Sequence, residues 1–196
     1  MRLFAIFSVV VVAISGVVST PVEIDLTSIL GTNLASSNSY GAPLAPWKYG
    51  SVPGWYYGNY PERHRNIRCL KGWICKFLSW FPWLVQCPKP PHIPPPTSDG
   101  YTQTFANLTG ATQAGDYMTY GLVDTIKDCK TMCNSVAGCK FANSYHDVNG
   151  KDGSTQLTCS LFATCHTASD ATNTGGQTQP DGSIDYITSS DGWCKD

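Results

Sequence analysis

The feature that most constrains the fold is a short stretch, residues 124–139, in which cysteines recur among apolar residues at helical intervals. Spacings of three and four residues are typical of an amphipathic α-helix. Thr125 and Asp128 form a capping box at its start, and Gly138 stands where a helix commonly ends. The stretch therefore predicts a helix with one apolar stripe, made of Ile126, Cys129, Met132, Cys133 and Val136.

Cys129 and Cys133 lie on the same face of this predicted helix. Residues four apart on a helix have β-carbons about 5–6 Å apart, whereas a disulfide requires roughly 3.5–4.5 Å between them. We therefore expect each of the two cysteines to bond to a different segment. The helix is then the element through which the fold is cross-linked.

The N-terminus, residues 1–19, has the composition of a secretory signal peptide. Arg2 is followed by a nearly all-apolar run, residues 3–12, and then by small residues. The run is too short to span a bilayer, and no later stretch is long and apolar enough to do so. We expect a secreted protein without a transmembrane segment once the signal peptide is removed.

In a secreted chain, nine cysteines are disulfide candidates. An even set lies in the C-terminal half, which suits a self-contained module. The odd set before it leaves one thiol over, and this thiol could form an intermolecular disulfide. The C-terminal set is Cys129, Cys133, Cys139, Cys159, Cys165 and Cys194, and the N-terminal set is Cys69, Cys75 and Cys87.

Composition and charge divide the mature chain into three parts. Residues 20–87 are aromatic and basic, residues 88–98 are rich in proline, and residues 99–196 are acidic. The proline-rich part predicts a polyproline spacer of roughly 28 Å and marks a domain boundary. Neither half is basic enough to predict a nucleic-acid partner.

The N-terminal part, residues 20–87, is expected to be largely irregular because Gly and Pro are dense in residues 41–60. Its aromatic residues could form a stacking surface for sugar rings, or they could lie against the neighbouring module. The hydrophobic segment Cys69–Cys87 leaves a similar choice. It could be an interfacial membrane helix, or a disulfide-closed hairpin that packs on the C-terminal module.

The C-terminal part alternates apolar and polar residues in several short runs, which predicts strands around residues 101–106, 117–123, 141–146, 157–161 and 184–188. Turns are predicted at Asn149-Gly150, at 180–182 and at Asp191-Gly192. A loop is predicted over residues 167–180. These runs and the predicted helix indicate one disulfide-linked module of class α+β, with one helix and several strands.

The spacing Cys129-x3-Cys133-x5-Cys139, with Cys159 heading Cys-Ser-Leu-Phe, resembles the PAN/apple module. That resemblance implies a single helix across a small antiparallel sheet. It also implies the disulfides Cys129–Cys159 and Cys133–Cys139, and it leaves Cys165–Cys194 as the third pair. The first two bridges would connect the helix to a later strand and to the residue just past the helix.

A wider resemblance runs from about residue 41 to the C-terminus. The segments Gly54-Trp55-Tyr56-Tyr57-Gly58, Tyr101-Thr102-Gln103-Thr104-Phe105 and residues 146–153 are similar to those of the secreted fruit-body-specific proteins of mushrooms. This resemblance implies expression in a developing fruiting body and a place in the cell wall or extracellular matrix. It implies no known reaction.

No metal or cofactor site is predicted. Starting from Asp147, a calcium loop fails because Lys151 and Asp152 occupy its fifth and sixth positions. Zinc ligation by cysteines with His146 or His166 is disfavoured because secreted cysteines are usually oxidised. The sequence also shows no nucleophile elbow and no phosphate-binding loop, so we expect no catalytic residues.

Three functions remain open at this stage. The first is a non-catalytic module that binds a wall glycan or glycoprotein through an exposed strand face or loop. The others are a structural wall protein anchored through Cys69–Cys87, and a wall-active hydrolase. The ligand-contact candidates are Tyr117, Tyr120 and Tyr145, although a place in the core is the favoured alternative for each. The sequon Asn107-Leu108-Thr109 predicts N-glycosylation at Asn107.

Overall fold

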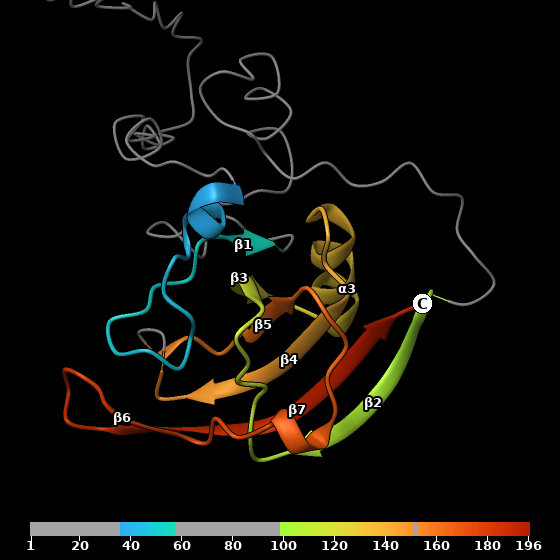
Figure 1. The fold of residues 1–196 in the computed structure, drawn as a ribbon. Helices are drawn as coiled ribbons and strands as arrows, with labels where there is room; N and C mark the ends of the chain where they lie inside the picture. Colours follow the sequence, from blue (N-terminus) through green and yellow to red (C-terminus); the bar gives the residue numbers. More distant parts are fainter. Residues whose placement is uncertain (1–35, 58–98, 151–152) are drawn as a thin grey trace, which may run out of the picture.

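A computed structural model describes residues 36–57, 99–150 and 153–196, which form a curved sheet with one α-helix against it (Figure 1). Seven strands join in one sheet with the order β1-β3-β5-β4-β7-β2, and β6 pairs with β7. All pairings are antiparallel except that of β1 with β3. The strands are β1 (Tyr56–Tyr57), β2 (Tyr101–Leu108), β3 (Tyr117–Val123), β4 (Phe141–Val148), β5 (Leu157–Phe162), β6 (Gly175–Thr178) and β7 (Ile184–Lys195).

The predicted helix is confirmed as α3 (Ile126–Ser135). The Thr125 hydroxyl accepts a hydrogen bond from the Asp128 backbone N–H (3.1 Å) and donates one to the Asp128 carboxylate (2.7 Å). These bonds satisfy groups that the first turn of a helix leaves unpaired. Gly138 follows the helix with a φ of +83°, a left-handed conformation that favours glycine. Two short 3-10 helices, η1 (Ser36–Gly41) and η4 (Ala168–Asp170), lie outside the sheet.

The apolar side of α3 packs on one face of the sheet and also contacts the N-terminal segment. Cys129, Met132 and Cys133 are completely buried there. Trp55 and Tyr57, which lie in or beside β1, belong to the same cluster, so residues 36–57 contribute to the core of the C-terminal part. The remaining buried members are Val123, Val136, Cys139, Ala142, Cys159 and Leu161.

The other face of the sheet carries an aromatic cluster of Phe105, Phe141 and Phe162. Loop residues cover it, among them Trp47. The Trp47 ring stacks on Phe162, with centroids 6.2 Å apart, and meets the Tyr117 ring edge-on at 5.6 Å. Trp55 and Trp47 therefore lie against the module on opposite faces of the sheet. Trp47 and Trp55 thus pack against the neighbouring module and do not form a stacking surface for sugar rings.

The described residues contain three disulfides, and their pairing is the one that the apple resemblance implied. Cys129–Cys159 joins α3 to β5, and Cys133–Cys139 closes the turn after the helix. Cys165–Cys194 joins the segment after β5 to the end of β7. All three lie within residues 129–194.

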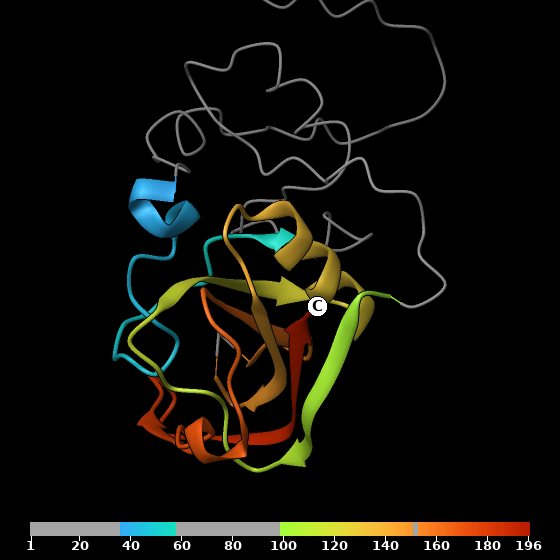
Figure 2. The ribbon, with the colours of Figure 1, turned by 45° about the vertical axis from the view of Figure 1, so that its right-hand side comes forward.

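The expected fold class, a small antiparallel sheet with one crossing helix, is wrong. The sheet is mixed and seven-stranded, and it dominates the described structure, with a single α-helix among the described residues. It is larger than expected because β1 comes from residues that were expected to be irregular. Figures 1 and 2 show β1 beside α3 and β2 at the opposite side of the sheet.

The turn expected at Asp191-Gly192 is also wrong, and this error hid the longest strand. Both residues lie inside β7, which pairs with β2, β4 and β6. Gly192 is needed there because a Cβ atom would lie only 2.4 Å from the Phe105 ring. Asp191 accepts a hydrogen bond from the Asn107 backbone N–H (2.9 Å). The loop expected over residues 167–180 likewise contains η4 and β6.

Candidate functional site

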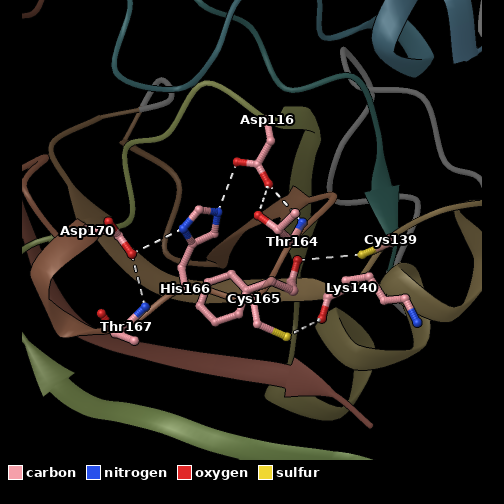
Figure 3. Close-up of polar contacts among 9 residues, drawn as sticks. Asp116, Cys139, Lys140, Thr164, Cys165, His166, Thr167 and Asp170 are labelled. Carbon is pink, nitrogen blue, oxygen red and sulfur yellow. Dashed lines mark hydrogen bonds and ion pairs between the residues drawn. The ribbon is translucent and has the colours of Figure 1, made fainter.

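One cluster of ionisable side chains brings together residues that are far apart in the sequence. His166, just after β5, lies between two aspartates (Figure 3). Its Nε2 is 2.9 Å from Asp116 Oδ1, and its Nδ1 is 3.2 Å from Asp170 Oδ2. Asp116 precedes β3 and Asp170 ends η4, so the imidazole connects three segments.

The surroundings of His166 hold its ring in place. The ring centroids of Phe141 and Phe162 lie 5.3 and 5.1 Å from the imidazole centroid in edge-to-face arrangements, and the His166 side chain is only 11% exposed. The neighbouring Cys165 is fixed by its disulfide to Cys194. The cluster therefore rests directly on the aromatic core.

Hydrogen bonds stabilise both carboxylates in their charged form. Burial raises the pKa of Asp116, but bonds from the Thr164 hydroxyl (2.6 Å), the Thr164 N–H (2.8 Å) and His166 outweigh it and hold that pKa below its ordinary value. The Thr167 N–H (3.1 Å) and then His166 lower the pKa of Asp170 in the same way.

This geometry suits a structural role, in which the imidazole connects two carboxylates, better than the role of a catalytic dyad. We call His166, Asp116 and Asp170 the His166 clasp. In a Ser–His–Asp arrangement, one imidazole nitrogen faces the nucleophile. Here both nitrogens face carboxylates, and both can donate together only when the imidazole is protonated. The Thr164 hydroxyl of this cluster donates to Asp116.

Sequence reasoning considered His166 only as a zinc ligand and missed its partners. Its distance of fifty residues from Asp116 leaves no local signal for that contact. The position of Asp170 beside residues 166–167 could have been predicted from the sequence, because Thr167 and Asp170 have the spacing of a helix capping box. Among the residues that the structure describes, no group of three or more His, Cys, Asp or Glu side chains could hold a metal ion.

The three tyrosines that were candidate ligand contacts lie near one another, but in the interior. Tyr120 and Tyr145 are 0% and 1% exposed. Burial raises the pKa of each of them, and the charge of Asp147 adds to this effect. The Tyr145 hydroxyl is 3.4 Å from Ser160 Oγ, and the half-buried Tyr117 donates to the backbone carbonyl of Ala42 (2.8 Å). Tyr120 and Tyr145 are therefore core residues and not surface contacts for a ligand.

A different tyrosine stands on the surface. Tyr186 in β7 is 50% exposed, and Ile184 on the same side of that strand is 60% exposed. Tyr186 pairs with Val148 of β4 and with Gly175 of β6. Because a glycine stands opposite the ring, no side chain covers it from that side.

This exposed surface continues the sheet face on which α3 lies. Side chains alternate along a strand, so His146 and Val148 of β4 point to the same side as the buried Ala142 under the helix. Thr188 pairs with His146 in the adjacent strand. We call this surface the outer face and define it by His146, Val148, Ile184, Tyr186 and Thr188, none of which is an Asp, Glu, Lys or Arg.

The sequon residue Asn107 lies at the end of β2 and is exposed, with a φ of +52°. Its side chain is thus placed at the surface. The predicted signal peptide (1–19), the linker (88–98) and the cysteines Cys69, Cys75 and Cys87 lie outside the described residues. Within the part of the chain that is described, no helix is long and apolar enough to cross a membrane.

Comparison of the chain with protein-family models, with curated proteins and with solved structures finds no match.

Proposed function

We propose that this chain is a secreted, non-catalytic binding protein of a fungal cell wall or extracellular matrix, and that it recognises glycan through the outer face. The observation that carries this proposal is the exposure of Tyr186 (50%) and Ile184 (60%) on the outer face, whose five defining residues include no Asp, Glu, Lys or Arg. A neutral polysaccharide is the extracellular ligand that matches such a surface.

The chemistry of the outer face supports this choice. A tyrosine offers a flat apolar ring, which suits the C–H faces of a sugar, and a hydroxyl at its tip that can bond to sugar hydroxyls. His146 and Thr188 add hydrogen-bonding groups on the same side of the sheet. Because the face is a strand surface rather than a deep pocket, little of a ligand is buried, and we expect weak affinity per site.

Three features support an extracellular location. The sequence begins with a signal-like segment, residues 1–19, and the described residues contain three disulfides. Disulfides persist mainly in oxidising compartments. The resemblance of residues 41–196 to fruit-body-specific proteins favours the mushroom wall as that location.

The absence of catalysis is part of the proposal and is argued from the His166 cluster. Both imidazole nitrogens are engaged by carboxylates, which leaves neither directed at a substrate. The cluster also lies on the aromatic core, and the outer face lies on the side of the sheet where α3 packs.

The test is retention of the native protein on insoluble wall polysaccharides, with chitin and β-glucan as probes. We expect wild-type protein to be retained and Tyr186→Ala to lose at least about fivefold in retention without a change in melting temperature. Tyr49→Ala is the matched control, because Tyr49 is 85% exposed but lies in the loop between η1 and β1. Release of reducing sugar is measured in the same samples and should stay at background.

No retention of wild-type protein on either polysaccharide would contradict the proposal. Equal losses in Tyr186→Ala and Tyr49→Ala would contradict the assignment to the outer face. Release of sugar by the wild-type protein would favour the hydrolase alternative.

A further inference from the structure

Residues 36–57 are bound to the rest of the protein as a separate peptide would be. Their strand β1 is followed along the chain by β2, yet the two strands lie at opposite ends of the sheet order. Consecutive strands usually lie side by side. None of the three disulfides involves residues 36–57, so packing and hydrogen bonds hold this segment to the module.

The segment docks by adding a strand to the edge of the sheet. Leu122 N–H donates to the Trp55 carbonyl (2.9 Å), and Gly54 N–H donates to the Tyr120 carbonyl (3.1 Å). Tyr56 and Tyr57 pair in parallel with Leu122 and Val123. Without this segment, β3 would be an open edge, which is a template for any strand of suitable sequence.

Trp55 is the anchor of the docked segment. Its side chain is completely buried, and its ring stacks on Tyr40 with centroids 5.6 Å apart. The site exists because residue 121 is glycine: a Cβ atom there would lie 2.1 Å from Trp55 Cδ1. A buried tryptophan in a fitted slot is the type of contact that dominates binding energy in peptide and protein interfaces.

Outside this slot, side-chain hydrogen bonds also hold the segment. The Tyr56 hydroxyl donates to Asp124 Oδ2 (2.6 Å), just before α3. The Tyr117 hydroxyl donates to the carbonyl of Ala42 (2.8 Å). The segment thus binds through a strand, a buried anchor and polar contacts, as a peptide ligand would.

We propose that this slot, defined by Gly121 of β3 and the facing side of α3, also accepts residues 36–57 of a second copy of this chain. Exchange needs no new surface, because every contact made within one molecule is made again between two. Residues 58–98 separate the segment from the module, and 41 residues can span at most about 140 Å. The covalent connection therefore does not restrict the segment to its own module. Reciprocal exchange gives a dimer, and one-way exchange gives an open chain of molecules.

The first test measures binding of a fluorescein-labelled peptide of residues 36–57 to full-length variants by anisotropy. Trp55→Ala weakens the chain's own segment and leaves the slot open, so this variant should bind the peptide. The matched control is the double variant Trp55→Ala/Gly121→Val, in which the slot is filled and binding should be at least tenfold weaker. Wild-type chain should bind little peptide, because its tethered segment competes at about millimolar effective concentration.

A Trp55→Ala chain with its three disulfides intact that binds no more peptide than the double variant would overturn the proposal. If Trp55→Ala fails to fold, wild-type protein provides the test. It is unfolded with its disulfides intact and refolded at about 1 mM, close to the effective concentration of the tethered segment, and at about 1 μM, far below it. Exchange predicts dimers or longer species only after refolding at 1 mM, and these should persist on dilution. Monomer alone at both concentrations would overturn the proposal.

Discussion

The two ends of the sheet are held by different forces. At the β1 end, residues 36–57 are held by packing and hydrogen bonds, centred on Trp55 in the slot beside Gly121. At the other end, the disulfide Cys165–Cys194 secures the end of β7, which pairs with β2. Lys130 also pairs with Asp99 there (2.6 Å), and its ammonium lies 3.6 Å from the Trp193 ring centroid.

This difference predicts different sensitivities for the two ends. A disulfide stabilises chiefly by restricting the unfolded chain, so its contribution disappears on reduction. A packed tryptophan is unaffected by redox state but depends on the shape of its slot. Reduction of Cys165–Cys194 should therefore act on the β2 end, whereas substitution of Trp55 should act on the β1 end, where Cys129–Cys159 and Cys133–Cys139 belong to the same cluster as Trp55.

The largest effect should come from reduction of the disulfides. By the loop-entropy model, Cys129–Cys159 and Cys165–Cys194 each stabilise by roughly 3–4 kcal/mol, and Cys133–Cys139 by roughly 2 kcal/mol. Since small domains have total stabilities of about 5–15 kcal/mol, the reduced protein should be largely unfolded. Near-UV circular dichroism before and after thiol treatment measures this. Unchanged cooperative unfolding after complete reduction would contradict the prediction.

The next largest effect on stability should come from a substitution at the β1 end of the sheet. Trp55→Ala should lower the free energy of unfolding by about 3–5 kcal/mol, because it removes a completely buried indole from the core. Denaturant unfolding of the oxidised protein measures this loss. Tyr49→Ala is the control and should change stability by less than about 0.5 kcal/mol, since Tyr49 is 85% exposed. Equal effects of the two changes would show that residues 36–57 do not contribute to the core.

A smaller, pH-dependent effect should arise at the His166 clasp, next to Cys165–Cys194. The folded pKa of Asp116 is below its unfolded value near 3.9, so its contribution is present above that pH and is lost as the pH falls through the folded pKa. Asp116→Asn should therefore lower stability at pH 7 by about 1–2 kcal/mol and flatten the loss of stability below about pH 4. Thermal unfolding between pH 2 and 7 tests this. Parallel pH profiles of the variant and the wild type would refute it.

The smallest effect on stability should come from the sequon. Asn107 lies at the end of β2, the strand at one end of the sheet order, and its backbone N–H rather than its side chain bonds to Asp191. Asn107→Gln should therefore change stability by less than about 0.5 kcal/mol. It should also remove the mass of one N-glycan from protein secreted by a eukaryotic host. A wild-type protein without that mass would contradict the glycosylation prediction.

A glycan on Asn107 would add a further difference between the β1 end and the β2 end of the sheet. The β3 edge is covered by the chain's own Trp55 segment, whereas a sugar on Asn107 would shield the β2 edge from pairing with another sheet. We therefore expect Asn107→Gln to show more self-association than the glycosylated protein in sedimentation experiments.

Local patterns were sufficient for the elements that depend on neighbouring residues. The α3 prediction is confirmed because its apolar period and the Thr125–Asp128 cap operate within a few residues. The strands predicted in the C-terminal part are present because alternation is also local. The same rules failed at Asp191-Gly192, where a turn-forming pair lies inside β7. There the packing of Phe105 against Gly192 outweighs local preference.

The sequence by itself determined the helix, its cap, most strands and the disulfide-rich character of residues 99–196. Only the tertiary structure decided that Trp55 belongs to the core, that His166 lies between Asp116 and Asp170, and that Tyr186 rather than Tyr120 or Tyr145 stands at the surface. The physical reason is that these outcomes depend on contacts between residues tens of positions apart. Gly121 illustrates this, because its role is to leave room for a side chain that lies 66 residues earlier in the chain.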